Sequence, residues 1–425
     1  MAPSTSPELR TVRVVVRTGS PLAEVFLIDH AFALVRRSVG DLDTTVDPGV
    51  YKAKAKLADA ETERLLLCDE DREIDLSEEL RVASPAPLSG TTRERSMDAG
   101  LTRNLSASIR GGPSSAAEVL LVTRRWTPSP VSLDASLHDS SGLLVPFPTT
   151  AEGPAADGAG SAVDAGSYFL RWHGAGDVAV EQTIQATAGW QTQVFVLDEP
   201  GEGSGLGATR VSVQMSRAGF DPASAELRRA EEARTALAEE RKISSPALED
   251  ILERSDNPML GLFGAHLMLL TRETAQRRSP SARPQAPVRF DAARFERLVM
   301  RLQSVLGLDH PDVVALTTQL PGPLPTSLGP ISAPPMLWRS WLLLVEASND
   351  TPMLVSPSVW RRAVGSLPLR PFLIWMTDAA DSADRLERVI ARALELEGPN
   401  TDVRRQLTSR LLVPRSVVDS FAPDR

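Results

Sequence analysis

The chain has 425 residues, of which 42% are hydrophobic and 24% are charged, as in an ordinary globular protein. Its length predicts about two to four domains, and its single cysteine, Cys68, excludes an intrachain disulfide and a zinc site built from cysteines. The net charge of −9 argues against a nucleic-acid-binding protein, because such proteins need a basic face.

The sequence does not predict a membrane protein. Residues 1–9 are rich in Ser and Pro, lack the pattern of a signal peptide and predict a disordered N-terminus. The longest apolar runs, Pro258 to Leu270 and Trp341 to Val345, are shorter than the roughly 20 residues that a membrane span needs. We therefore expect a soluble, cytoplasmic protein. The many Ala, Pro and Arg residues suggest a GC-rich bacterial genome.

The first strand-forming region covers residues 10–82. Residues 10–17 and 24–29 are rich in β-branched and apolar residues. From residue 50 to 57, lysines alternate with alanine and leucine, which puts one face of a strand in water and the other in a core. With further strands expected at 61–67 and 73–76, this region predicts an antiparallel β-sandwich module.

A second module is predicted at residues 117–216. Strands are expected at 119–123, 131–135, 143–146, 168–173, 178–186, 191–197 and 209–215. Residues 83–116, rich in Ser, Pro and Gly, predict a linker between the two modules, either irregular throughout or with a short ordered piece near Met97 to Leu105. Residues 151–163 are nearly all small, and predict a flexible loop within the second module.

The two tyrosines of the chain lie in the same five-residue frame, which predicts an internal repeat. In each frame we expect the aspartate to bond the turn backbone, the glycine to supply a positive φ, and the tyrosine to pack its ring into the core. The two frames consist of Asp47, Pro48, Gly49, Val50 and Tyr51, and of Asp164, Ala165, Gly166, Ser167 and Tyr168.

These frames and the strands after them resemble the PEGA-like and transthyretin-like (carboxypeptidase regulatory) β-sandwich modules. In those families a Pro-Gly-x-Tyr turn starts a strand that two more strands follow. Residues 47–76 match this pattern, and residues 164–197 match it with Ala165 in place of the proline. The resemblance implies structural or binding modules and carries over no catalytic residue.

After Met215 the periodicity becomes helical, so the predicted fold class is β followed by α. A helical segment is expected at 217–275, an Arg/Pro linker at 276–289 and an all-α domain of unrecognised family at 290–425. Within the last region, helices are expected at about 292–306, 311–319, 336–347, 357–364, 371–377, 383–397 and 402–411, with Asp309 as the cap of the second.

No motif in the sequence names a reaction. There is no nucleophile elbow, no Walker sequence and no histidine cluster, so we expect no catalytic, cofactor-binding or metal-binding residue. Gly261, Gly264 and His266 share an apolar helix, and Trp338 and Trp341 share a helix face; each set indicates either tight intrachain packing or a partner interface. Arg277 and Arg278 predict a protease-sensitive linker.

Three functional hypotheses remain open. The first is a non-enzymatic adaptor or scaffold whose β-modules and α-domain bind other proteins. The second is a regulatory subunit or protease target in a bacterial signalling or defence system, suggested by the Arg277–Arg278 linker. The third is an enzyme whose site is not visible in sequence.

Overall fold

The structure is a computed structural model. It describes residues 11–421 except for 21–22, 58–59, 78, 81–83, 89–92, 111–115, 126–134, 153–155, 174–177, 199–208, 241–242, 244, 255, 277–289, 323–327 and 368. The chain divides into two compact units. Unit 1 comprises Met1–Ala83, Glu231–Glu253 and Leu267–Phe290, and unit 2 comprises Ser84–Ala230, Arg254–His266 and Asp291–Arg425.

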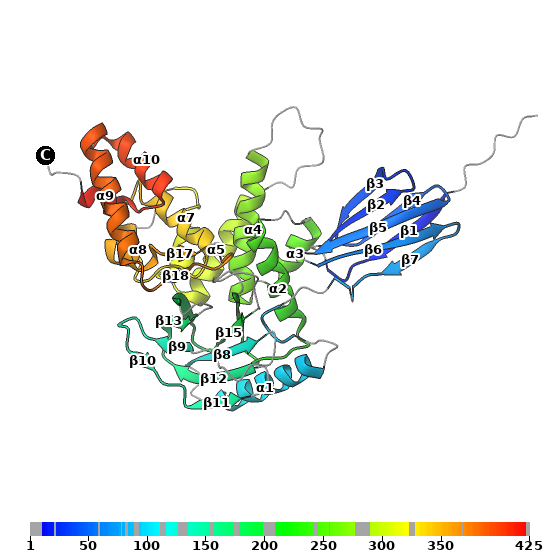
Figure 1. The fold of residues 1–425 in the computed structure, drawn as a ribbon, viewed down its shortest axis with the longest axis horizontal. Helices are drawn as coiled ribbons and strands as arrows, with labels where there is room; N and C mark the ends of the chain where they lie inside the picture. The colour runs from blue at the N-terminus through cyan, green and yellow to red at the C-terminus, as the bar shows by residue number, and fades with distance from the viewer. Residues whose placement is uncertain are drawn as a thin grey trace, which may run out of the picture. The chain divides into compact units, whose positions relative to one another are not determined.

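The strands of unit 1 form two sheets, which we call module 1 (Figure 1). One sheet has the order β4-β1-β7 and the other the order β3-β2-β5-β6. Buried valines of β1 and the alternate buried residues of β5 form the interior of the module. The strands are β1 (Val12–Arg17), β2 (Glu24–Asp29), β3 (Leu34–Val39), β4 (Leu42–Val46), β5 (Gly49–Leu57), β6 (Ala60–Cys68) and β7 (Arg72–Asp75).

Unit 2 contains a second group of strands, module 2, in which β8, β9, β10, β12, β13, β14 and β15 follow the order of the strands of module 1 and further strands are added. Its sheets have the orders β11-β12-β8-β15-β16 and β10-β9-β13-β14-β18-β17. The strands up to β16 are β8 (Ala117–Arg125), β9 (Ala135–His138), β10 (Leu144–Val145), β11 (Thr149–Glu152), β12 (Ala156–Val163), β13 (Gly166–His173), β14 (Ala179–Ala186), β15 (Gln191–Asp198) and β16 (Thr209–Ser216).

The strand pairs of module 1 have counterparts in module 2. The antiparallel pairs β2–β3, β2–β5, β5–β6 and β1–β4 correspond to β9–β10, β9–β13, β13–β14 and β8–β12. The expectation of purely antiparallel sheets is wrong, because β1 pairs with β7 in parallel and β8 pairs with β15 in parallel. In both modules the chain leaves one sheet after β6 or β14 and returns to the other sheet beside its first strand.

The tyrosine frames occupy equivalent places in the two modules. Tyr51 on β5 and Tyr168 on β13 are each 8% exposed. The hydroxyl of Tyr51 donates to the carbonyl of Asp47 at 2.8 Å, and that of Tyr168 donates to the carbonyl of Asp164 at 2.9 Å. Gly49, however, does not have a positive φ, so the expected reason for that glycine is wrong.

A second turn is also repeated, at the β2–β3 and β9–β10 hairpins. The N–H groups of Asp29 and Asp139 donate to the carbonyl four residues on, at 3.0 and 2.9 Å. Each aspartate carboxylate accepts from the N–H groups two and four residues on. The fourth residue of the turn has a positive φ in both hairpins: it is Phe32 (φ 60°) in module 1 and Gly142 (φ 87°) in module 2.

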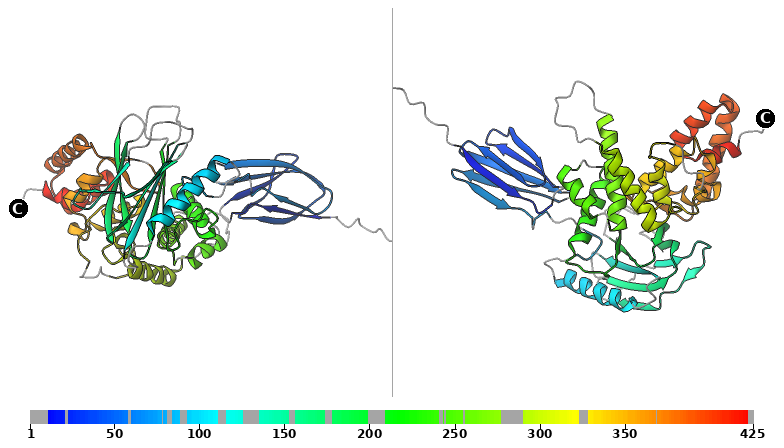
Figure 2. Two further views of the ribbon diagram at one scale, coloured as in Figure 1. Left: turned by 90° about the horizontal axis from the view of Figure 1, so that it is seen from below. Right: turned by 180° about the vertical axis from the view of Figure 1, so that it is seen from behind.

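Regular structure lies within both the predicted linker and the predicted flexible loop. Helix α1 (Arg93–Ile109) lies in the expected linker and packs along β8, β11 and β12 (Figures 1 and 2). Most of the expected loop at 151–163 is strand β12. Its small residues allow this packing, since a Cβ at Gly158 would lie 2.5 Å from Leu105 and one at Gly160 would lie 2.5 Å from Ile109.

The C-terminal half is mainly helical, as predicted. The helices that follow β16 are α2 (Ala225–Ala238), α3 (Ser245–Glu253), α4 (Pro258–Gln276), α5 (Ala292–Leu306), α6 (Pro311–Thr317), α7 (Trp338–Ala347), the short 3-10 helix η2 (Pro352–Leu354), α8 (Pro357–Ala363), α9 (Ala380–Glu397), α10 (Thr401–Leu411) and α11 (Arg415–Ser420).

Two short strands join this half to module 2. β17 (Ser366–Leu367) and β18 (Ile374–Met376) extend the sheet beyond β14. The helix expected at 371–377 is therefore wrong: the short apolar run pairs with β14, with Trp375 opposite Glu181. The expectation that residues 290–425 form a separate domain is also wrong, because β18 lies in the same sheet as β14 and both belong to unit 2.

Candidate interaction surface

One face of the β3-β2-β5-β6 sheet carries the exposed side chains of its strands, and we call it the outer face of module 1. Alternate residues point to it. From the register of the strands, they include Glu24, Phe26 and Ile28 on β2, Lys52, Lys54 and Lys56 on β5, and Glu61, Glu63, Leu65 and Leu67 on β6.

Ion pairs cover one end of this outer face. The ammonium of Lys54 lies 2.5 Å from a carboxylate oxygen of Glu61, and that of Lys52 lies 2.7 Å from Glu63. Arg37 pairs with Glu24 at the other edge of the sheet. Lys52, Lys54 and Arg37 are thus each paired with a glutamate, which makes this end less suited to a polyanion.

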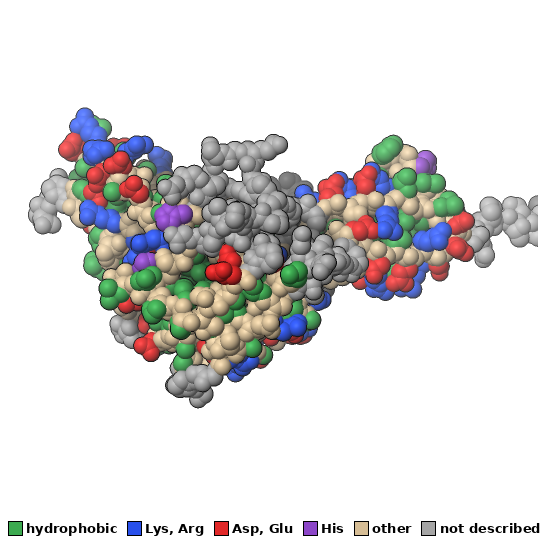
Figure 3. All heavy atoms as spheres, turned by 60° about the horizontal axis from the view of Figure 1, so that its bottom comes forward, with side chains coloured by type: hydrophobic (Ala, Val, Ile, Leu, Met, Phe, Trp, Pro, Cys, Tyr) green, Lys and Arg blue, Asp and Glu red, His purple; other side chains and the backbone are tan. Residues whose placement is uncertain are grey.

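The other end of the outer face is apolar, and we call it the apolar end. Exposed leucines lie side by side with an exposed valine, since Val50 is opposite Leu67 and Lys52 is opposite Leu65. In Figure 3 hydrophobic side chains gather at one end of module 1, beside a histidine. The exposed fractions are 84% for Phe32, 57% for Leu34, 46% for Val50, 77% for Leu65 and 55% for Leu67.

Phe32 marks this end further, because its backbone is strained. A bulky residue rarely adopts a positive φ, and the conformation costs about 1–2 kcal/mol. Module 2 has a glycine at the equivalent position. Module 1 therefore holds an exposed aromatic ring where the backbone favours glycine, and strain of this kind is common at binding sites.

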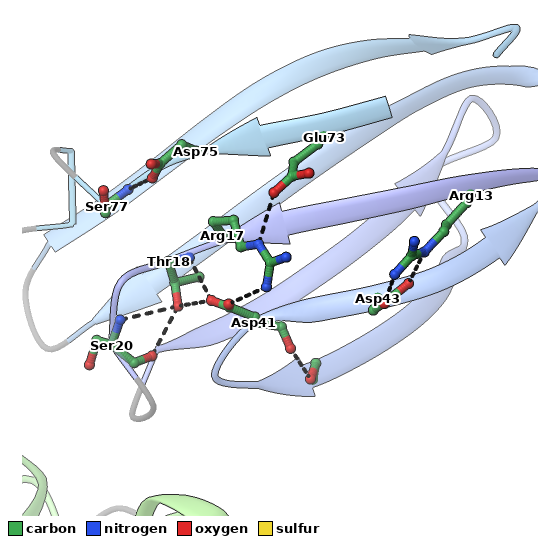
Figure 4. A network of polar contacts seen from close by, with 10 residues as sticks. Arg13, Arg17, Thr18, Ser20, Asp41, Asp43, Glu73, Asp75 and Ser77 are labelled. Carbon is green, nitrogen blue, oxygen red and sulfur yellow. Dashed lines mark hydrogen bonds and ion pairs between the residues drawn. The ribbon is translucent and has the colours of Figure 1, made fainter. Parts of the chain in front are cut away.

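The β4-β1-β7 sheet presents a different exterior. Arg13 of β1 makes two bonds to the carboxylate of Asp43, at 2.9 and 2.5 Å, and Arg17 bonds Glu73 at 2.9 Å and Asp41 at 3.1 Å (Figure 4). These exposed pairs run across the three strands. Such a charged exterior is ordinary solvated surface, so the apolar end is a local property of the other sheet.

In module 2 the equivalent face is covered. The registers place Tyr51 opposite Leu66 and Tyr168 opposite Ile184, which makes Glu181 the equivalent of Glu63. By the same alignment Thr183 corresponds to Leu65, and Phe169 to Lys52. Glu181, Thr183 and Phe169 are at most 2% exposed, whereas Leu65 is 77% exposed.

The cover comes from the C-terminal half. Trp375 of β18 packs edge-on against Phe169, with ring centroids 6.5 Å apart. Arg362 of α8 lies 3.4 Å above the Phe169 ring and donates to Glu181 at 2.6 Å, while Arg171 donates to the same carboxylate at 2.9 Å. Burial raises the pKa of Glu181, but the bonds from Arg362 and Arg171 lower it more, so its pKa lies below the ordinary 4.5.

A cavity of about 370 Å³ lies beside this contact. Its charged lining consists of Arg171, Arg361 and Arg362 with Glu181 and Asp384. Two of the arginines bond Glu181, and Arg361 bonds a glutamate of α9 at 2.8 Å. No histidine, cysteine or serine lines it, and its carboxylate Glu181 is held by Arg171 and Arg362.

Buried histidines form the other polar cluster of interest in unit 2. The Nε2 of His266 lies 2.9 Å from the hydroxyl of Ser340, which in turn hydrogen-bonds Asp312. Burial, aided by the charge of Arg339, lowers the pKa of His266 to about 3. Burial likewise raises the pKa of Asp312 to about 6, although its hydrogen bonds oppose the rise. A catalytic triad needs the aspartate on the histidine ring and an accessible serine, and here Ser340 is fully buried.

The role of this cluster is to hold helix ends. The Asp312 carboxylate accepts the N–H groups of Met336 and Leu337, just before α7, at 2.8 and 3.0 Å. The cap of α6 is His310, whose Nδ1 accepts the N–H of Asp312 at 3.2 Å, so the expectation that Asp309 caps this helix is wrong.

The residues that the sequence marked as a possible interface lie elsewhere. Gly261, Gly264 and His266 are buried in α4, and Trp341 is 2% exposed, while Trp338 is partly exposed. Arg277 and Arg278 lie outside the described residues. None of these residues belongs to the apolar end of module 1.

The apolar end was not predicted from the sequence, although the sequence of β6 indicates it. Leu65, Leu66 and Leu67 are consecutive in the strand β6. Since alternate residues point to opposite faces, three leucines in a row must put apolar groups on both faces.

No group of histidine, cysteine and acidic side chains among the described residues has the arrangement of a metal site. No described helix is long and apolar enough to cross a membrane. Comparison with protein-family models and with curated proteins finds no match to this chain.

Proposed function

We propose that this protein is a non-enzymatic adaptor that binds another protein through the apolar end of module 1. The observation that carries the proposal is the contrast between equivalent positions: Leu65 is 77% exposed in module 1, and Thr183 is fully buried in module 2. The same sheet face is covered within the chain in one module and open in the other.

The chemistry of the surface favours a protein as the ligand. Contiguous exposed apolar side chains on a soluble domain mark interaction sites, and aromatic residues are enriched in them. The apolar end lies on the face of a sheet, and a small molecule prefers a concave site. The neighbouring lysines are paired with glutamates, which disfavours nucleic acid.

Module 2 has another role in this proposal. Its equivalent face packs against β18 and α8, so it supports the C-terminal half instead of offering a surface. The repeated topology and the shared tyrosine turn support a common ancestry for the modules and their resemblance to PEGA-like or transthyretin-like β-sandwiches.

Site-specific photo-crosslinking in the source cells tests the proposal. A photoreactive phenylalanine analogue is placed at Leu65, at Phe32 or, as a matched control, at Met300, which is a 59% exposed apolar residue of α5. We expect one discrete adduct with a different protein from the first two positions and none from the control. Equal labelling at all three positions, or an adduct only with a second copy of this chain, would refute the adaptor.

A further inference from the structure

We propose that the partner binds module 1 by adding an antiparallel β-strand to β6, in the way that β18 adds to β14 within this chain. This inference rests on the proposed function and specifies the partner: an extended segment with a large apolar side chain over the outer face and a basic side chain near Glu63.

The first support is the equivalence of the two edges. β6 ends its sheet, and no other described strand pairs with its second edge. The equivalent strand β14 carries β18 on that edge, with Val180, Glu181 and Gln182 opposite Met376, Trp375 and Ile374. The corresponding residues of β6 are Thr62, Glu63 and Arg64, by the shared registers.

The second support is the side chains around the edge. In module 2 the added strand brings Trp375 onto the outer face, and the segment just before it brings Arg362 to Glu181. Module 1 keeps the acidic group as Glu63, which is 53% exposed in its side chain, and adds the exposed Leu65 and Leu67 beside it. An aromatic or aliphatic residue opposite Glu63 would cover these leucines.

The inner side of the edge adds selectivity. Arg64 lies on the inner side of β6 and pairs with Glu79, which also accepts from the hydroxyl of Thr62 at 2.6 Å. A charged residue on the inner side of an edge strand discourages indiscriminate pairing with apolar strands. The residue of β18 opposite Gln182, the equivalent of Arg64, is Ile374, so a strand that pairs with β6 in the same register places its own residue beside this charge.

The occupant is a strand of a different protein. The segment of this chain that would suit β6, β18, is already paired with β14, and its Trp375 is 1% exposed. Strand addition supplies affinity through backbone hydrogen bonds and specificity through alternate side chains. Both elements are present at β6.

The test uses the full-length chain and a fluorescent peptide with the sequence of residues 370–378, Arg-Pro-Phe-Leu-Ile-Trp-Met-Thr-Asp, which contains β18. Binding is followed by fluorescence anisotropy. A series of peptides carries one backbone N-methyl group at each successive position from Phe to Met. We expect saturable binding that alternate N-methyl groups weaken about 10-fold, since only every second N–H faces the neighbouring strand.

Two protein variants locate the binding. Leu65→Asp should weaken binding at least about 10-fold, because the apolar contact of a leucine is lost. Leu144→Asp is the matched control, since Leu144 is a 65% exposed leucine of the β10 edge in module 2, and it should leave binding unchanged.

Each other outcome overturns the inference in a recognisable way. A flat N-methyl profile with sensitivity to Leu65→Asp would reject strand addition and leave the apolar docking surface of the proposed function standing. An alternating profile that ignores Leu65→Asp would place the strand on another edge. No binding at 1 mM peptide, about the weakest affinity of interest, would reject β6 as a strand acceptor. Concentration-dependent dimerisation of the chain alone, lost in Leu65→Asp, would make a second copy the occupant.

Discussion

The contact between Glu181 and Arg362 predicts an unequal effect of removing two adjacent arginines. Arg362→Met should lower the free energy of unfolding of unit 2 by about 3 kcal/mol. A hydrogen bond from a charged donor to a buried carboxylate contributes about 1.5–3 kcal/mol, and a desolvated cation–π contact contributes about 0.5–2 kcal/mol. Arg171 still bonds Glu181 at 2.9 Å in the variant. The loss of unfolding free energy should therefore stay below the sum of the upper values of these two ranges.

Arg361→Met is the matched control. Arg361 is 63% exposed in its side chain and bonds Glu387 on the surface, so its removal should cost at most about 1 kcal/mol. Urea unfolding followed by tryptophan fluorescence measures both variants, with an unchanged dependence on urea concentration. Equal destabilisation by the two substitutions would refute the reasoning that Glu181 and Phe169 anchor the C-terminal half.

The effect of Arg362→Met also depends on pH. The folded-state pKa of Glu181 lies below its ordinary value of 4.5, so the ionised pair stabilises the fold above that pH. This contribution is lost as the pH falls through the folded pKa. The difference in stability between wild type and variant should therefore shrink below about pH 4.5, and a difference that grows on acidification would contradict the assignment.

Three further predictions follow from the turns and the buried histidine. Phe32→Gly should raise the stability of module 1 by up to about 1 kcal/mol in thermal unfolding while weakening partner binding, because it relieves the positive φ. Tyr51→Phe and Tyr168→Phe should each lower stability by about 1 kcal/mol in urea, since each removes one equivalent hydrogen bond. Between pH 7 and pH 5, wild type should lose about 2 kcal/mol more stability than His266→Gln. The reason is that His266, with an ordinary pKa of 6.5, takes up a proton in the unfolded state but not in the folded state.

Different results would contradict these predictions. A destabilised Phe32→Gly variant would show that the ring has a packing role. Unequal losses for the two tyrosine variants would show that the repeated turns differ in energy. For the histidine the sign matters: its folded pKa is depressed to about 3, so its contribution to stability is lost as the pH falls below 6.5, and equal losses of stability in wild type and His266→Gln would refute its burial.

The repeat could be predicted from the sequence because its signals are local. The Asp-x-Gly-x-Tyr frame and the alternation after it depend on neighbouring residues, and these lie at the start of β5 and β13. The strand β18 could not be predicted in this way. A short apolar run such as Phe372 to Met376 suits a buried helix or a buried strand equally well, and only its partner β14 decides between them.

The prediction of a flexible loop over the small residues of β12 is wrong for a related reason. Gly158 and Gly160 suggest flexibility when they are considered alone. Their function depends on Leu105 and Ile109 of α1, which approach too closely for any side chain at those positions. The composition of a segment shows that its residues are small, but it does not show which neighbouring side chains require them to be small.

The joining of β14 to β18 has a consequence for synthesis on the ribosome. Arg362 follows Glu181 by 181 residues, so translation at about 5–20 residues per second separates their emergence by roughly 10–40 s. During that interval the β14 edge and the ring of Phe169 lack the segment that covers them. Module 1 needs no such segment for its described strands to pair. A nascent chain should thus complete module 1 early and hold module 2 open, exposed to chaperones, until β18 has left the ribosome.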